Sequence, residues 1–340
     1  MRTPLPAVRA GVRVSYGHES HRVGTVSGGA VKLARLAKVF PDERNEWNLL
    51  YLASSALPLD ARVLATLASR RGAKLVWNQD GVLYSGLGIP GFERMNRTRA
   101  RLLHAADYVF FQSEFSKESA DRCYGEREEA WEILYNAVDT SVFIPAPQST
   151  PTELTLLLGG SQYQRYRIDV ALRTLALLPE ARLIVTGALS FDRADRARAH
   201  VLALADDLGV RQRLELTGPY AQADAPSLLQ RAHLLLHTKY NDPCPGVVVE
   251  AMACGLPVIY SASGGVPELV GSEAGIGVPA PRDFESDHPP APEDLAAAVR
   301  AALPNLDELA LAARSRAVHN FDLRPWIERH RIVFENVIAP

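Results

Sequence analysis

The chain has 340 residues, of which 47% are hydrophobic and 22% charged, a composition typical of a globular protein of about two domains. Its formal net charge of −2 lacks the basic excess of general nucleic-acid-binding proteins. Its three widely spaced cysteines form no CxxC pair, which argues against a disulfide framework and a structural zinc site. The N-terminus lacks the apolar core of a signal peptide and no apolar run could span a membrane, so we expect a cytoplasmic protein.

Residues 11–135 alternate between short apolar runs and stretches with helical spacing. The predicted strands are 11–17, 48–53, 74–78, 107–112 and 132–135. The predicted helices are 29–40, 59–71, 92–106 and 116–124. Because strands that alternate with helices form parallel pairs, this order predicts a doubly wound parallel sheet.

A second series of the same kind follows residues 140–151, which are rich in Pro, Ser and Thr and typical of a linker. Its predicted strands are 153–158, 182–186, 213–217, 233–237 and 257–260. Its predicted helices are 168–178, 194–208, 225–232, 247–254, 293–303, 306–319 and 326–337, with a polar loop at 283–292. We therefore predict an α/β protein of two Rossmann-like domains, 1–147 and 148–321, with a ligand in the cleft beyond the carboxyl ends of the strands.

The segment 241–265 reads NDPCPGVVVEAMACGLPVIYSASGG and predicts a short helix. Pro245 suits its first position, Gly255 suits a left-handed stop, and Pro257 prevents continuation. The free N–H groups and the dipole at its N-terminus favour a negative ligand by about 0.3–1 kcal/mol.

Two carboxylates in this segment, Asp242 and Glu250, are candidate acceptors for the vicinal hydroxyls of a sugar or ribose. Their spacing alone favours a structural or solvated pair of carboxylates over a binding site. The sequence Glu250-Ala-Met-Ala-Cys-Gly-Leu-Pro-Val, preceded by Asp242 and followed by Gly264-Gly265 and Pro267-Glu268, adds a second argument. It resembles the signature of the group 1 (family four) retaining glycosyltransferases, whose GT-B fold has two Rossmann-like, doubly wound parallel-sheet domains facing a cleft.

The resemblance, which also includes 106–116 and 135–145 and extends over about 106–335, implies a nucleotide-sugar site. It implies that Asp242, in place of the usual and longer Glu, binds hydroxyls of the transferred sugar, and that Glu250 binds the nucleotide ribose. Pro245 replaces a usual Gly and has no N–H, so Gly246 and Val247 are the expected donors to the ligand. The first domain is then expected to bind the acceptor, with residues 322–340 packing back on it.

The phosphate-binding cations of the family are replaced here by Ser161 and Tyr166. Arg165 and Arg167 stand beside these positions and are the candidates to bind the diphosphate, since guanidinium suits bidentate contact with phosphate; solvated side chains at a helix entry are the alternative. Gly160 completes the predicted donor-binding set.

The first domain supplies the other candidates. Gly28 and Gly29 stand where the family has a glycine-rich loop that meets phosphate or acceptor, although an ordinary loop pair fits too. The usual histidine after the third strand is missing, and Asn78, Gln79 and Asp80 are the candidates to bind a sugar hydroxyl instead. His18 and His21 follow the first strand and are candidates for the cleft, with a surface position as the alternative.

The resemblance implies transfer of a sugar from a nucleoside diphosphate to a hydroxyl of a glycan, glycolipid or small molecule, with retained anomeric configuration. No DxD motif is present, so we expect neither a metal nor a cofactor, the sugar nucleotide being a substrate. A catalytically silent sugar-nucleotide-binding relative is the main alternative, because the family's His, Arg and Lys are missing; an epimerase or phosphorylase of similar architecture fits the motif less well.

Arg94, Arg97 and Arg101 fall near one face of the predicted helix 92–106. A basic helix can bind anionic lipid heads, which suggests peripheral contact with the inner face of a membrane; a solvated helix face is the alternative. The sequence gives no indication of an oligomeric state.

Overall fold

The computed structural model describes residues 11–17, 28–146 and 153–339, which form two compact units. Unit 1 takes its residues from Met1–Ala137, Phe284–Ser286 and Leu323–Pro340, and unit 2 from Val138–Asp283 and Asp287–Asp322. His18 and His21, both candidates from the sequence, lie outside the described residues. Within the described part of the chain, no helix is long and apolar enough to cross a membrane.

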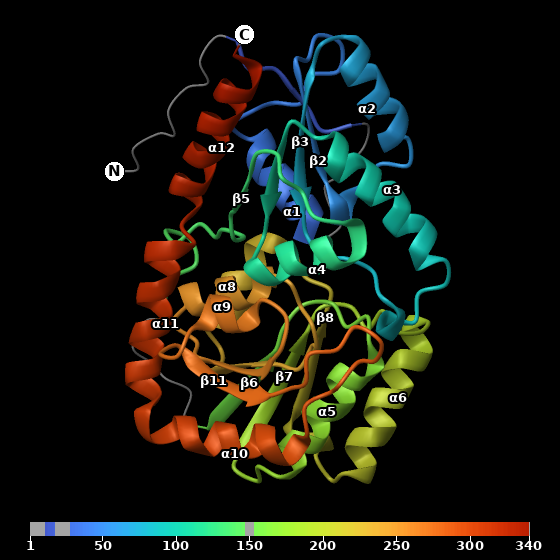
Figure 1. Ribbon diagram of the computed structural model, residues 1–340. Helices are drawn as coiled ribbons and strands as arrows, with labels where there is room; N and C mark the ends of the chain where they lie inside the picture. The colour runs from blue at the N-terminus through green and yellow to red at the C-terminus, as the bar shows by residue number, and fades with distance from the viewer. Residues whose placement is uncertain (1–10, 18–27, 147–152, 340) are drawn as a thin grey trace. The chain divides into compact units, whose positions relative to one another are not determined.

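Unit 1 is built on a parallel sheet of five strands in the order β1-β2-β3-β4-β5 (Figure 1). The strands are β1 (Val14–Ser15), β2 (Leu49–Ala53), β3 (Lys74–Gln79), β4 (Tyr108–Phe111) and β5 (Trp131–Ile133). The helices are α1 (Gly28–Ala37), η1 (Ser54–Ala56), α2 (Ala61–Arg70), η2 (Ser85–Leu87), α3 (Phe92–Ala105), α4 (Glu114–Tyr124) and α12 (Leu323–Ile338).

The sheet of unit 1 is covered on both faces, which is why its strands are almost continuously apolar. Leu50 and Leu52 of β2 point into a core with α2, α3 and α4, whereas Tyr51 between them points into a core with α1 and α12. Val14 of β1 pairs with Leu49 and also forms a parallel bridge to Asp42, the segment that follows α1. The segment after α1 therefore lies on one side of β1 and strand β2 on the other. Helix α1 packs on the face of the sheet opposite to α2.

Unit 2 is built on a parallel sheet of six strands in the order β11-β10-β9-β6-β7-β8 (Figure 1). The strands are β6 (Leu154–Leu158), β7 (Ala181–Thr186), β8 (Leu214–Gly218), β9 (Leu234–His237), β10 (Val258–Ala262) and β11 (Gly275–Pro279). The α-helices are α5 (Arg165–Ala176), α6 (Ala194–Asp207), α7 (Ala225–Leu229), α8 (Gly246–Ala253), α9 (Val266–Val270), α10 (Pro292–Ala302) and α11 (Leu306–Asn320). Short 3₁₀ turns complete the unit at η3 (Arg211–Arg213), η4 (Gln222–Asp224) and η5 (Leu303–Asn305).

The order of the unit 2 strands reverses between β6 and β9. Strands β7 and β8 are added on one side of β6, and β9, β10 and β11 on the other. In open parallel sheets, the crevice beyond the carboxyl ends of the strands at such a reversal is where ligands bind. The prediction of two doubly wound parallel α/β sheets is confirmed. The reversal in unit 2 indicates that a ligand would bind at the carboxyl edge of its sheet, next to β6 and β9.

Three details of the sequence prediction need correction. Strand β11 and helix α9 were not expected. Strand β11 was missed because its sequence, GIGVP at Gly275–Pro279, combines two glycines and a proline, which are rare in strands. As an edge strand, β11 tolerates that proline. Helix α5 begins at Arg165, earlier than the predicted 168. From the predicted loop 283–292, Phe284 belongs to the core of unit 1, where its ring stacks on Phe115 at 5.7 Å.

Candidate functional site

Three segments of unit 2 converge beyond the carboxyl ends of β6 and β9. The turn after β6 contains Gly159 and Gly160, and a Cβ at Gly159 would lie 2.4 Å from Cγ2 of Val247 in α8. Only glycine permits this approach between the turn and the helix. The N–H of Gly160 donates to Oγ1 of Thr186, at the end of β7, over 3.3 Å. The predicted donor-binding residues Gly160 and Val247 therefore border the same point of reversal.

The N-terminus of α8 lies at this point. Pro245 was predicted as the first helical residue, but it is extended, with φ −67° and ψ 119°, and the helix begins at Gly246. This is a correction of one position, and it makes Gly246 and Val247 the first two residues of the helix. In the described structure, Pro245 supplies no side-chain cap to the first turn. The N–H groups of such a turn and the helix dipole favour an anion.

Asp242 lies in the turn between β9 and α8, almost buried among cationic and polar groups. Its Oδ2 is 3.1 Å from Nζ of Lys239 and 3.4 Å from Nε2 of His237. Burial by itself would raise the pKa of Asp242, but the charge of Lys239, the contact with His237 and the charge of Arg167 together hold this pKa well below its usual range. The carboxylate is therefore ionised at neutral pH.

The backbone around Asp242 is held by the Ser263-Gly264-Gly265 turn. The N–H of Gly265 donates to the carbonyl of Asp242 at 2.9 Å, and Oγ of Ser263 accepts the N–H of Asn241 at 2.9 Å. A Cβ at Gly264 would lie 2.4 Å from the carbonyl oxygen of Asp242. Asn241 itself has a left-handed φ of 49°. The glycine pair of the motif therefore positions the loop that carries the acid.

Glu250 lies in the second turn of α8 and is 8% exposed. Its Oε1 accepts a hydrogen bond from Nε2 of Gln222 at 2.7 Å. Tyr220, in the same loop after β8, is close enough that the pKa of its hydroxyl is raised, first by burial and then by the charge of Glu250. The carboxylate thus faces the loop after β8, whereas Asp242 belongs to the loop after β9.

The two candidate arginines differ in their surroundings. Arg167 is buried, and its guanidinium donates to the carbonyls of Ser161 at 3.0 Å and Gly159 at 3.4 Å, so it braces the turn after β6. Arg165 is exposed, with Nε 3.5 Å from Oδ2 of Asp169. Tyr166 stands between the two arginines in the sequence, and its hydroxyl accepts a hydrogen bond from the N–H of Tyr240 at 3.0 Å. Phosphate binding by Arg165 or Arg167 stays a prediction.

The candidates of unit 1 lie at the carboxyl ends of β3 and at the start of α1. Gly28 and Gly29 are the first two residues of α1. Asn78 and Asp80 both accept hydrogen bonds from Nζ of Lys32 in α1, at 2.6 Å for Asp80, and all three side chains are buried.

Further contacts occupy the same loop. Asp80 also accepts the N–H of Ser55 at 2.8 Å. Gln79 accepts from Nε1 of Trp77 and donates to the carbonyl of Gly81, at 2.8 and 2.9 Å. These side chains thus bond to other groups of unit 1, and their contact with a sugar hydroxyl stays a prediction.

Arg94, Arg97 and Arg101 are exposed on α3. Among residues 11–17, 28–146 and 153–339, no group of three or more His, Cys, Asp or Glu side chains is arranged to hold a metal ion. Sequence reasoning missed Lys239, His237, Gln222 and Lys32. Lys239 stands only three positions before Asp242 and could have been noticed, but Gln222 and Lys32 are distant in sequence from their carboxylate partners.

Comparison with known proteins identifies the family. The model of the family described as glycosyl transferases group 1 matches residues 144–316, about half of the chain. The chain belongs to this family. A D-inositol 3-phosphate glycosyltransferase of Mycobacterium sp. (strain JLS) is 28% identical over 178 residues, which are 50% of this group 1 glycosyltransferase but only 40% of the relative.

Solved structures resemble this group 1 glycosyltransferase over most of its length. Sucrose-phosphate synthase from Thermosynechococcus elongatus matches with a TM-score of 0.73 and 19% identity, over 92% of this chain and 77% of that one. HepE of Anabaena in complex with UDP matches with a TM-score of 0.69 and 21% identity, over 92% and 84%. At such identities the likeness shows the fold alone, and the GT-B prediction is confirmed.

Proposed function

We propose that this group 1 glycosyltransferase moves a hexose from a nucleoside diphosphate to a hydroxyl acceptor with retention of the anomeric configuration. The observation that carries the proposal is the placing of α8 at the strand reversal of unit 2, with Asp242 just before the helix and Glu250 in its second turn. Helix α8 and the turn before it thereby offer N–H groups to a diphosphate. Their two carboxylates can accept hydrogen bonds from the hydroxyls of the sugar and the ribose that flank this diphosphate.

The donor is a sugar nucleotide, and a uridine nucleotide is the first to test. The fold neighbour HepE is described in complex with UDP and with UDP-glucose, which supports this choice. In the proposed complex, the N–H groups of Gly246 and Val247 bind phosphate oxygens and Glu250 binds the ribose. The turn at Gly160, braced by Arg167, forms the other wall of the phosphate site.

Asp242 is proposed to bind hydroxyls of the transferred sugar as an ionised acceptor. Departure of the diphosphate builds negative charge, and Lys239 beside Asp242 supplies a cation where Ser161 and Tyr166 replace the family's Arg and Lys. This ammonium, the dipole of α8 and the nearby Arg165 and Arg167 would make a metal unnecessary. A leaving phosphate oxygen takes the proton of the acceptor on the same face of the sugar, which gives retention.

The acceptor is proposed to be a hydroxyl of a glycan, a glycolipid or a small molecule. The name of the mycobacterial relative, D-inositol 3-phosphate glycosyltransferase, supports a polyhydroxylated acceptor in general. In unit 1, Gly28, Gly29 and the Asn78–Asp80 loop are proposed to meet it. The exposed Arg94, Arg97 and Arg101 would hold the protein at an anionic membrane if the acceptor is lipid-linked.

Two substitutions test the site. Glu250→Gln should weaken binding of both UDP and UDP-glucose, whereas Asp242→Asn should leave UDP binding intact and weaken binding and turnover of the sugar nucleotide. Binding is measured from the rise in melting temperature, since a ligand at a hundred times its Kd stabilises the folded state by about 2.7 kcal/mol. Glu215→Gln, an exposed ion-paired carboxylate of unit 2, is the control.

The outcomes separate the proposal from its alternative. Turnover that survives EDTA, with a product whose anomeric configuration by proton NMR matches the donor, supports it. Binding of sugar nucleotides without hydrolysis or transfer to any acceptor would identify the silent relative. If no sugar nucleotide raises the melting temperature, or if both site variants bind and react like the wild type, the assignment is wrong.

A further inference from the structure

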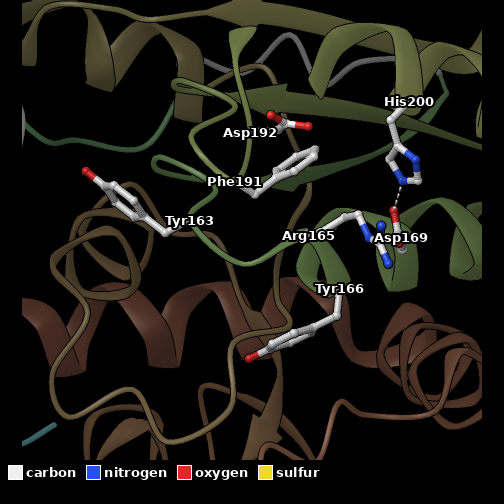
Figure 2. A pocket seen from close by; sticks show the side chains of 7 residues that line it. All are labelled: Tyr163, Arg165, Tyr166, Asp169, Phe191, Asp192 and His200. Atoms are coloured by element: carbon white, nitrogen blue, oxygen red, sulfur yellow. Dashed lines mark hydrogen bonds and ion pairs between the residues drawn. The ribbon is translucent and has the colours of Figure 1, made fainter. Parts of the chain in front are cut away.

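An open pocket of about 550 Å³ lies in unit 2 beside the N-terminal ends of α5 and α6. Its lining comes from the loop after β6, the first two turns of α5, the loop after β7 and α6 (Figure 2). In chain order the lining residues are Tyr163, Arg165, Tyr166, Asp169, Phe191, Asp192 and His200. The proposed donor residues Asp242 and Glu250 are not part of this lining, whereas Arg165, a candidate for the diphosphate, is. The pocket needs an explanation of its own.

The two loops that form the pocket are bonded to each other through their backbones. The N–H of Gln162 donates to the carbonyl of Ala188 at 2.8 Å, and the N–H of Ser190 donates to the carbonyl of Gln162 at 2.8 Å. These bonds form an isolated parallel bridge between Gln162 and Leu189. The pocket is therefore preformed by the fold, which lowers the entropy cost of binding a ligand.

Aromatic rings form the apolar part of the lining. Tyr163 is 61% exposed, a large fraction for an aromatic side chain. The ring of Phe191, on the facing loop, is partly exposed and meets the ring of His200 edge-on at 6.0 Å. Figure 2 shows Phe191 beside Asp192, with Tyr163 apart from them on the other loop. Exposed aromatic faces of this kind suit the C–H face of a sugar ring.

Charged groups form the rest of the lining. Asp169 accepts from Nε2 of His200 at 2.7 Å and pairs with Arg165 at 3.5 Å, and Asp192 is exposed at the rim. Two carboxylates and one guanidinium do not favour an anion such as free phosphate. Carboxylates accept hydrogen bonds from hydroxyls and guanidinium donates them, so the set suits a neutral polyhydroxylated ligand.

We propose that this pocket is a carbohydrate subsite that binds a neutral pyranose unit, with Tyr163 against the ring face and Asp192 on its hydroxyls. Tyr166 connects the pocket to the donor site, because it lines the pocket while its hydroxyl accepts the N–H of Tyr240, two residues before Asp242. The bound unit is a part of a glycan acceptor, and this assignment of the acceptor rests on the proposed function.

The test measures carbohydrate binding without any nucleotide. Saturation-transfer NMR is recorded on the full chain with neutral trisaccharides of glucose, mannose and N-acetylglucosamine at about 10 mM, tenfold above a millimolar Kd. We expect at least one to bind, and Tyr163→Ala and Asp192→Asn each to weaken it about tenfold, the loss of a stacking or charge-assisted contact. Leu177→Ala and Asp195→Asn, exposed residues of the same unit outside the pocket, should bind like the wild type.

The proposal is overturned if no trisaccharide binds the wild type, or if the two pocket variants bind as well as the controls. Binding of UDP-glucose is measured in the same variants and should not change, which keeps the two hypotheses separate. Failure of UDP-glucose and every other sugar nucleotide to bind would reject the proposed function, whereas loss of trisaccharide binding in Tyr163→Ala would still establish the subsite.

Discussion

At the carboxyl edge of the unit 1 sheet, Lys32 and Asp80 form an ion pair whose side chains are only 4% and 9% exposed. The remaining hydrogen bonds of this pair go to Asn78 and Ser55. At the corresponding edge of unit 2, Lys239 and Asp242 form a pair that is 26% and 13% exposed and stands beside the N-terminus of α8. The first pair is enclosed by its own unit, whereas the ammonium of the second still reaches the surface.

The difference indicates two uses of charge. A buried ion pair contributes little beyond neutral packing, but removing one partner is costly because the other charge is left buried. The pair of unit 1 therefore fixes the loops around α1. The pair of unit 2 stands on a turn in which Asn241 has a left-handed φ of 49°, and its partial exposure fits the proposed contact with a ligand. The predictions below test this contrast.

The largest expected effect is on the stability of unit 1. Lys32→Met leaves Asp80 buried without its cation and should lower the free energy of unfolding by about 3–5 kcal/mol. All four tryptophans of the chain belong to unit 1, so their fluorescence in a urea titration follows the unfolding of this unit. The exposed Lys38→Met is the control. A loss below about 1 kcal/mol, the range of surface pairs, would contradict the enclosed pair.

The matching change in unit 2 should affect rate more than stability. Lys239→Met removes the proposed cation and should lower kcat by about thirtyfold, equivalent to about 2 kcal/mol, with little change in melting temperature. Because Lys239 is the largest influence that lowers the pKa of Asp242, this pKa should rise, and the acid limb of the pH–rate profile should move to higher pH.

Two further variants test whether the charge of Lys239 accounts for that result. Lys239→Arg should recover most of the rate, because it restores the charge. Arg231→Met, which removes an exposed cation paired with Glu215 elsewhere in unit 2, should react like the wild type. Unchanged kcat and an unmoved acid limb in Lys239→Met would mean that Lys239 is an ordinary surface cation.

The sequence predicts the fold well because its signals are local. The apolar run of β2 and the helical spacing of α1 depend on residues a few positions apart, and both elements were predicted close to their observed bounds. The motif around α8 was equally visible. Strand β11 was missed because its stability comes from pairing with β10, not from its own composition.

The surroundings of the site residues could not be predicted in the same way. Phosphate binding by Arg167 stays a prediction, but the hydrogen bonds from its guanidinium to the carbonyls of Gly159 and Ser161 could not be read from the sequence. Asp80 meets Lys32 across 48 positions of sequence, and Glu250 meets Gln222 across 28. Such contacts depend on how the segments are brought together, which no local pattern encodes.

Acid should weaken unit 1 through His330. Burial lowers the pKa of this residue to about 3, and its neutral ring accepts from the Tyr51 hydroxyl at 3.1 Å while Nδ1–H donates to the Trp326 carbonyl at 2.9 Å. The unfolded chain takes up this proton near pH 6.5, so stability falls as the pH drops from 6.5 towards 3. Between pH 7 and pH 5 the loss is about 2 kcal/mol.

The substitution His330→Gln tests this linkage, since an amide keeps a donor and an acceptor but does not titrate. Its stability at pH 7 should be lower than that of the wild type, yet the loss between pH 7 and pH 5 should shrink by about 2 kcal/mol when followed by tryptophan fluorescence. An equal pH dependence in both proteins would show that the pKa of His330 is the same in the folded and unfolded states, and would contradict the prediction.

The smallest effect concerns the hydrogen bond between Gln222 and Glu250. Gln222→Leu removes a donor that orients the carboxylate, and the Kd for UDP should rise about fivefold, equivalent to about 1 kcal/mol, with kcat nearly unchanged. Gln230→Leu, which loses a hydrogen bond to the Ile144 carbonyl in the same unit, is the control. If Gln222 acts through Glu250, its substitution should have no further effect in a Glu250→Gln background. Additive losses would instead place Gln222 in direct contact with the nucleotide, and the loop after β8 would then be a wall of the binding site in its own right.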